Sequence, residues 1–146
     1  MQRELITFHV AGQLFGLDIM DIREIRAWSP VTRLPHVPAY VAGVVNLRGS
    51  VLPVFDLAAR LGWSPTEATP RNPIIVIDIN GKSRGLIVDS VNDIVSIPAL
   101  SLQQPDASGH DGIIPFIEGL APLGEDMVIV LNLAALSADE QPEIKA

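Results

Sequence analysis

The side chains that could do metal or covalent chemistry do not occur at the spacings that such chemistry requires. The histidines His9, His36 and His110 are not arranged as H-x-x-x-H or H-E-x-x-H, whereas a zinc site needs several ligands held together. None of the serines lies in a G-x-S-x-G elbow, and neither a Walker-type glycine loop nor G-x-G-x-x-G occurs. We therefore expect no metal, no cofactor and no triad chemistry.

Carboxylates could still form an aspartic-protease dyad across the twofold axis of a duplicated β protein. Such a dyad requires matching aspartates, each followed by Thr or Ser and then by Gly. Asp89-Ser90 is followed by Val91, and Met20 stands at the matching position of the first copy. The dyad therefore lacks its second member, and a duplicated-barrel hydrolase is only a distant alternative. We expect that the protein is not an enzyme.

Arg48 is the charged residue with the most informative surroundings. It lies at a turn within the apolar hairpin Asn46-Leu47-Arg48-Gly49, and the corresponding neighbourhood of the second copy, Phe116-Ile117-Glu118-Gly119, contains no base. Arg48 is either a solvated turn residue or one half of an ion pair that places a charged spot in an apolar surface. Glu24, which shares a strand face with Ile22, is the candidate acid.

An internal duplication organises the chain. An offset of 69 residues aligns Phe8–Ile19 with Ile77–Val88, so that Gly12 falls on Gly81 and Gly16 on Gly85. The match continues through β-like sequence, with Ile22 on Val91, Glu24 on Asp93 and Ile25 on Ile94, and it resumes after an insertion with Asp56-Leu57-Ala58-Ala59 on Asn132-Leu133-Ala134-Ala135. Asp56 and Asn132 are typical helix N-caps.

Each copy is predicted to contain two hairpins and a short helix. Asn80-Gly81, between Ile74–Ile79 and Arg84–Val88, is a strong signal for a two-residue turn, and Ala11-Gly12 takes that place between Ile6–Val10 and Phe15–Ile19. The second hairpins are predicted to pair Val41–Leu47 with Val51–Phe55, through Arg48-Gly49-Ser50, and Ile113–Leu120 with Met127–Leu131, through 122–126. The short helices are expected at Leu57–Leu61 and Leu133–Leu136.

These elements predict an all-β fold with short helices, made of two pseudo-twofold-related, five-stranded β-barrels that pack on a shared core with a groove between them. Strands such as Ile74–Ile77 are apolar at consecutive positions and need cover on both faces. We expect a single domain over residues 1–146, with one lobe at roughly 1–65, the other at roughly 70–140, interleaving possible at the termini, and a linker at Trp63–Pro73.

Composition limits the class of function. Hydrophobic residues make up 48% of the chain and charged residues 18%, which is typical of a folded globular protein. The absence of cysteine fits a reducing cytosol. The formal net charge of −7 argues against nucleic acid as a partner, and no apolar run is long enough for direct membrane insertion. We expect a cytoplasmic protein.

The motifs that carry this pattern resemble the CheW family of bacterial chemotaxis coupling proteins. The resemblance covers nearly the whole chain and is most specific in Gly43–Leu57, where an N-L-R-G turn is followed by P-V-x-D-L. Phe15–Ile19, Ile22–Ile25, Val31–Pro35, Gly85–Val91 and Leu123–Leu131 agree with it.

The resemblance implies SH3-like barrels and a scaffold between the cytoplasmic tips of chemoreceptors and the regulatory domain of the histidine kinase CheA, with recruitment to membrane-associated arrays. It implies a receptor-binding site at Ile22, Glu24, Asn46, Arg48 and Gly49, in which the acid and the arginine pair. It also implies kinase contacts at the barrel ends, which cannot be assigned to residues. A coupling protein of a non-flagellar array, controlling twitching motility or second-messenger synthesis, is the alternative.

Overall fold

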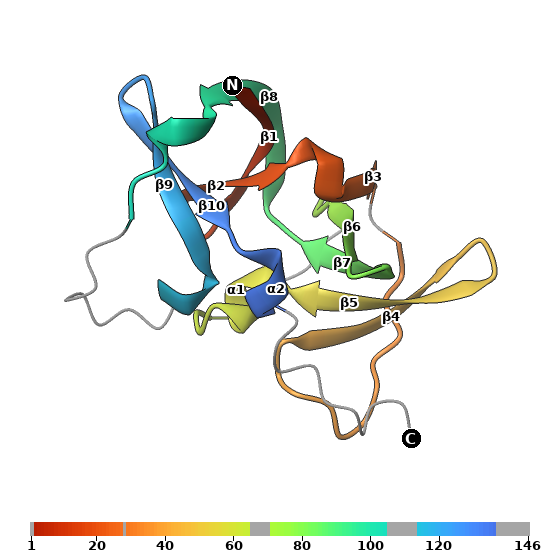
Figure 1. Cartoon of the computed structure of the whole chain (residues 1–146). Helices are drawn as coiled ribbons and strands as arrows, with labels where there is room; N and C mark the ends of the chain where they lie inside the picture. The colour runs from red at the N-terminus through yellow and green to blue at the C-terminus, as the bar shows by residue number, and fades with distance from the viewer. Residues whose placement is uncertain (1, 28, 65–70, 105–113, 137–146) are drawn as a thin grey trace.

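The chain folds almost entirely into β-strands joined by short turns (Figure 1). The computed structural model describes residues 2–27, 29–64, 71–104 and 114–136. The strands within these ranges are β1 (Gln2–Val10), β2 (Gln13–Asp18), β3 (Ile22–Arg26), β4 (Val41–Leu47), β5 (Ser50–Asp56), β6 (Ile74–Ile79), β7 (Lys82–Ile87), β8 (Ser90–Pro98), β9 (Ile117–Leu123) and β10 (Asp126–Leu131). The helical elements are η1 (Ile19–Asp21), α1 (Leu57–Arg60), η2 (Ala99–Ser101), η3 (Ile114–Phe116) and α2 (Leu133–Leu136).

Three hairpins use two-residue turns with left-handed backbone conformations. Ala11-Gly12 and Asn80-Gly81 confirm the predicted turns, with φ of 52° and 80° in the first and of 52° and 82° in the second. Two consecutive positive φ values match the twist of the strands that such a turn joins. In the β4–β5 hairpin the turn is Arg48-Gly49 alone, because Ser50 already pairs with Leu47 and begins β5. The three-residue turn predicted there was one residue too long.

The last hairpin differs more from its prediction. The stretch Ile114–Phe116 is a 3-10 turn around Pro115, so β9 begins only at Ile117. The strand then runs past Leu120 to Leu123, and Pro122 pairs with Met127 inside the ladder. Proline is tolerated there because β9 lies at the edge of its sheet. Ile113, part of the predicted strand, lies outside the described residues, as do His110 and positions 65–70 of the predicted linker.

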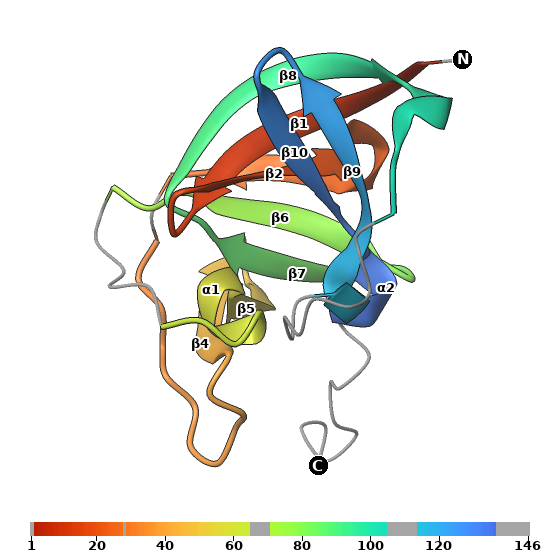
Figure 2. The same cartoon turned by 90° about the vertical axis from the view of Figure 1, so that its left-hand side faces the viewer.

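The strand order confirms the duplication. Sheet A has the order β8-β1-β2-β10-β9, and sheet B has the order β3-β6-β7-β5-β4. Exchanging each of the first five strands with the strand five places later turns one order into the other. Both sheets also contain a matching parallel pair, β10 with β2 and β5 with β7. The two sheets are therefore related by a pseudo-twofold axis, and Figure 2 shows sheet A arching over β6 and β7 of sheet B.

Isolated bridges close both sheets into barrels. The chain that leaves β3 returns to pair Thr32 with Val44 of β4, and the chain that leaves β8 pairs Gln103 with Leu120 of β9. At the first bridge the backbone approaches Gly43, where a Cβ atom would lie only 2.1 Å from the carbonyl oxygen of Thr32. Gly43, whose φ is +150°, is thus required for closure of barrel B. The expected pair of five-stranded barrels is confirmed.

The expected lobe boundaries do not follow the barrels. Sheet A takes β1 and β2 from the first half of the chain and β8, β9 and β10 from the second, and sheet B is mixed in the mirrored way. The exchange extends through both barrels and is not confined to the termini. The exchange arises because β6 and β7 pair into the sheet that contains β3, β4 and β5. The hairpin of β1 and β2 is completed by β8, β9 and β10 from the second copy.

Three apolar clusters fill the fold, and the largest is shared. Phe8 and Phe15 of sheet A meet Phe55, Ile75 and Leu86 of sheet B in that shared cluster, and all five are buried. The two smaller clusters lie inside the individual barrels, around Leu52 and Val76 in B and around Leu5 and Val128 in A. Consecutive residues of β6 therefore serve different clusters, which explains why the strand is apolar on both faces. Within the described residues, no helix is long and apolar enough to span a membrane.

We propose that residues 1–146 are one folding unit. If the chain is divided between residues 64 and 71, neither 1–64 nor 71–146 should fold alone, because each barrel would lose strands to the other fragment. We expect collapsed amide dispersion in the NMR spectrum of each fragment and recovery of dispersion when the two are mixed. A well-dispersed spectrum from either fragment alone would contradict this proposal.

Candidate functional site

Glu24 and Arg48 form an ion pair, which was one of the two interpretations of Arg48 that the sequence left open. Nη2 of Arg48 donates to Oε2 of Glu24 at 3.3 Å. The Arg48 side chain is 70% exposed and the Glu24 side chain 30%. The acid is thus held against the protein while most of the arginine faces solvent. The pair is therefore largely exposed, and its removal should cost less stability than the loss of a partly buried pair would.

The hairpin tip that carries Arg48 is fixed by its neighbours in sequence. The side-chain Oδ1 of Asn46 accepts a hydrogen bond from the backbone N–H of Gly49 at 2.8 Å. Gly49 has a φ of 88°, which glycine adopts without strain. The structure therefore brings together Glu24, Asn46, Arg48 and Gly49 of the predicted site, with Asn46 and Gly49 building the turn that presents Arg48.

Arg48 itself has a φ of 51°, a conformation that is unusual for a residue with a long side chain. Such backbone conformations cost on the order of 1 kcal/mol outside glycine and the small Asn and Asp. Asn80 takes the equivalent turn position in the β6–β7 hairpin, where it fits without this cost. A strained arginine at an exposed tip favours a role for its guanidinium group in binding.

Sequence reasoning missed Arg26, which also belongs to this site. Nη1 of Arg26 lies 3.5 Å from Oε2 of Glu24, so that one carboxylate faces two guanidinium groups. The Nε of Arg26 is buried and has no hydrogen-bond partner within the described residues. Strand alternation was the available signal, since Glu24 and Arg26 are two residues apart on β3 and share its less exposed face.

Ile22 lies apart from this charged cluster. It is partly buried at the start of β3, where it packs against the shared core. Exposed apolar residues on the same sheet include Ile25 of β3 and Val51 of β5, which are 42% and 73% exposed. Val51 pairs with Asn46 on the hairpin that carries Arg48. The hairpin therefore offers a cation next to apolar surface, and it projects from the body of the fold (Figure 1).

A second charged network ties β1 to the crossover between the barrels. Arg3 binds Glu118 of β9 at 2.8 Å and Asp18, at the end of β2, at 3.3 Å. The hydrogen bond to Glu118 raises the pKa of Arg3 above its usual value, against the opposing effect of burial. Burial, followed by the nearby charge of Asp18, raises the pKa of Asp21. The network links β1 to β9, which is far away in the sequence, and to the end of β2.

The described residues show no cluster suited to metal binding. No three His, Cys, Asp or Glu side chains among them come close enough together to hold a metal ion. His9 is engaged by Asn92 at 2.9 Å, and Asp56 caps α1 by accepting from the backbone N–H of Ala59. His9 and Asp56 thus both have structural partners.

Comparison with known proteins agrees with this architecture. Residues 4–141 match the family model of the CheW-like domain. The probable chemotaxis protein CheW of Rhizobium etli is 43% identical over 141 residues, which cover 97% of this chain and 91% of that protein. The crystal structure of the scaffolding protein TtCheW from Thermoanaerobacter tengcongensis superimposes with a TM-score of 0.83 at 34% identity, covering 93% of this chain and 88% of that one.

A relative with a different name is more distant. Protein PilI of Pseudomonas aeruginosa is 29% identical over 115 residues, which cover 79% of this chain and 65% of that protein.

Proposed function

The chain belongs to the CheW-like family of chemotaxis scaffolding proteins, and from this premise we propose that it is an adaptor that couples chemoreceptors to the histidine kinase CheA. It would hold the cytoplasmic tips of the receptors and the regulatory domain of the kinase in one complex. We further propose that it catalyses no reaction and that it is cytoplasmic, joining membrane-associated arrays through its protein partners.

The observation that carries the receptor-binding part is the geometry around Arg48. A guanidinium group that is exposed, held from one side by Glu24 and carried by a hairpin that also exposes Val51 can form forked hydrogen bonds to a partner without losing its orientation. We propose that Ile22, Glu24, Asn46, Arg48 and Gly49 form the receptor-binding site, with Arg26 added as a second cation beside Glu24.

Binding of the kinase regulatory domain tests the coupling role directly. We expect the purified protein to retain the CheA encoded in the same genome on an affinity column, and to raise its autophosphorylation only when receptor is also present. The protein without receptor is the control, and it should leave the kinase rate unchanged. Failure to retain the kinase at micromolar concentrations would exclude the proposal.

Coupling within a non-flagellar array uses the same kind of contacts and differs only in which receptor and kinase are present. The relatives named for chemotaxis are more similar to this chain than PilI is, so we prefer chemotaxis.

A further inference from the structure

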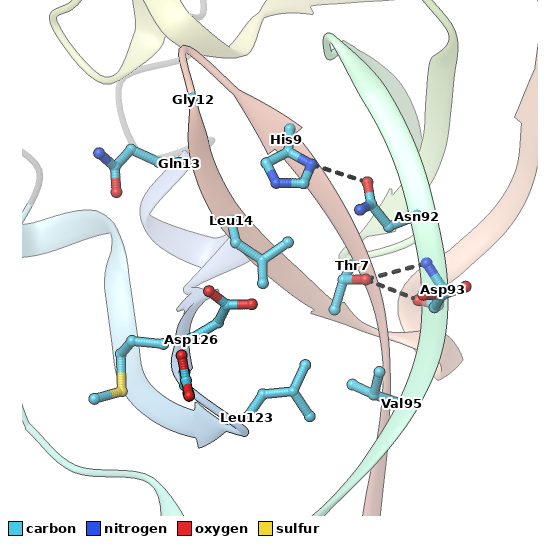
Figure 3. Close-up of a pocket in the computed structure, with 12 residues that line it drawn as sticks. Thr7, His9, Gly12, Gln13, Leu14, Asn92, Asp93, Val95, Leu123 and Asp126 are labelled. Atoms are coloured by element: carbon cyan, nitrogen blue, oxygen red, sulfur yellow. Dashed lines mark hydrogen bonds between the residues drawn. The ribbon is translucent and has the colours of Figure 1, made fainter.

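A pocket of about 410 Å³ opens in barrel A, on the sheet that does not carry Arg48. Its floor consists of Leu14, Val95 and Leu123, which are continuous with the small apolar cluster inside that barrel. Figure 3 shows these three side chains pointing into a common space between β1, β8 and the β9–β10 hairpin. Three acidic residues, Asp93, Glu125 and Asp126, belong to its lining, and no lysine or arginine among the described residues lines it.

The strand registers show that this pocket is the pseudo-twofold counterpart of the Glu24–Arg48 site. Val95 pairs with Leu5 in sheet A as Arg26 pairs with Ile74 in sheet B, which places Asp93 at the position of Glu24. The β9–β10 hairpin corresponds to the β4–β5 hairpin with an offset of 76 residues. Leu123 pairs with Asp126 in the first as Leu47 pairs with Ser50 in the second. Gly124 therefore stands where Arg48 stands, which corrects the match to Phe116–Gly119 made from the sequence.

One polar contact is kept in both barrels. In barrel B, Arg23 of β3 forms an ion pair with Asp78 of β6 at 3.2 Å. At the same positions in barrel A, Asn92 of β8 meets His9 of β1 at 2.9 Å. The two sites therefore correspond position by position along β3 and β8, and the residues that fill them can be compared.

The two barrels differ in their arginines. In barrel B, Glu24 is bound by Arg26 and Arg48. In barrel A, valine and glycine replace these two arginines, while the carboxylate remains as Asp93 and two more are added as Glu125 and Asp126. None of the three is paired with a cation within the described residues. The space that arginine side chains occupy in one barrel is an open pocket in the other.

We propose that this pocket binds an arginine side chain of a partner protein. The aliphatic stem would lie on Leu14, Val95 and Leu123, and the guanidinium group would face the carboxylates, as those of Arg26 and Arg48 face Glu24. Arginine fits better than lysine because its planar fork can satisfy more than one carboxylate. The inference concerns a surface that the proposed receptor site does not include, and it holds whichever partner supplies the side chain.

The test is a titration of the isotope-labelled full-length protein with the peptide acetyl-Gly-Arg-Gly-amide, followed by amide chemical shifts. We expect saturable shifts at Thr7, Gly12, Asn92 and Asp93, with a dissociation constant on the order of millimolar for so small a ligand. The same peptide with neutral citrulline in place of arginine should bind on the order of tenfold more weakly. Free guanidinium ion should also bind more weakly, because it lacks the stem that contacts the floor.

Four variants sharpen the test. A Cβ at Gly124 meets nothing within 4 Å, so Gly124→Arg should fold at the cost of the backbone strain that a side chain has at a φ of 61°. Its arginine should pair with Asp93 and block the peptide, whereas Gly124→Gln should not. The double variant Asp93→Asn with Asp126→Asn should weaken peptide binding by on the order of tenfold, while Glu4→Gln, an exposed carboxylate outside the pocket, should leave it unchanged. Equal binding of the arginine and citrulline peptides, or no saturable shift at these amides, would overturn the proposal.

Discussion

Replacing Arg48 by alanine is expected to weaken receptor binding by on the order of tenfold or more while the fold survives. The guanidinium group is 70% exposed, so its loss should change the free energy of unfolding by only about 0–1 kcal/mol. Its loss at a receptor interface removes forked hydrogen bonds and leaves the partner's groups unpaired, which is far costlier. Binding of receptor tips, measured by calorimetry beside thermal unfolding, separates the two effects.

Glu24→Ala should also weaken receptor binding, because Arg48 then loses the group that holds it in place. Unlike Arg48→Ala, it should destabilise the fold measurably, since Arg26 would be left partly buried without its acid. The double variant should lose less receptor affinity than the sum of the two single losses, as expected for residues in contact. Additive losses would show that the pair does not act as a unit.

Arg33→Ala is a matched control, because Arg33 is exposed and lies outside the pair. Kinase binding should be largely spared in all of these variants. If Arg48→Ala left receptor affinity unchanged, Arg48 would be a solvated turn residue.

Replacing Arg60 by alanine is expected to cause the largest loss of stability. The side chain is only 7% exposed, and it donates from Nε to the carbonyl oxygen of Leu136 at 2.8 Å and from Nη2 to that of Ala135 at 3.2 Å. Its guanidinium carbon also lies 4.4 Å from the ring centroid of Tyr40 and 4.6 Å from that of Phe116. Arg60 thus joins α1 to the end of α2 from the other half of the chain.

Its removal leaves buried carbonyl groups without their donor and removes both cation–π contacts, at a cost of about 3 kcal/mol. For a chain of this size, that corresponds to a fall in Tm of about 10 °C in thermal unfolding. Arg60→Lys should recover only part of this loss, because an ammonium group lacks the fork that reaches two carbonyls. Arg33→Ala serves again as the control, and a Tm within about 2 °C of the parent protein for Arg60→Ala would refute the structural role.

Much of the geometry around Arg48 could be predicted because its determinants are local. Asn46, Arg48 and Gly49 belong to one turn, and a glycine, which tolerates positive φ, indicates such a turn directly. Pairing of Arg48 with Glu24 was one of two open interpretations, because a strand pattern tells which face a residue takes and not which strand lies beside it. Arg26 was missed for that reason, although it shares the face of Glu24.

The sequence by itself determined most of the local elements, the duplication and the need for a shared core. Alternation of apolar and polar residues indicates a strand covered on one face, and a run of apolar residues indicates a strand covered on both. The isoleucines of β6 are the clearest case of the second pattern. These patterns are properties of neighbouring residues, so no knowledge of distant partners is needed to interpret them.

Only the tertiary structure decided which strands share a barrel. Hydrogen bonding between backbones is nearly indifferent to sequence, so the hairpin of β1 and β2 could have taken its outer neighbours from its own half of the chain. The packing of the whole chain instead places β8 beside β1 and β10 beside β2. The same holds for contacts over long sequence separations, such as Arg60 with the carbonyl of Leu136. The acidic pocket of barrel A likewise arises from residues on β1, β2, β8, β9 and β10 that only the closed barrel brings together.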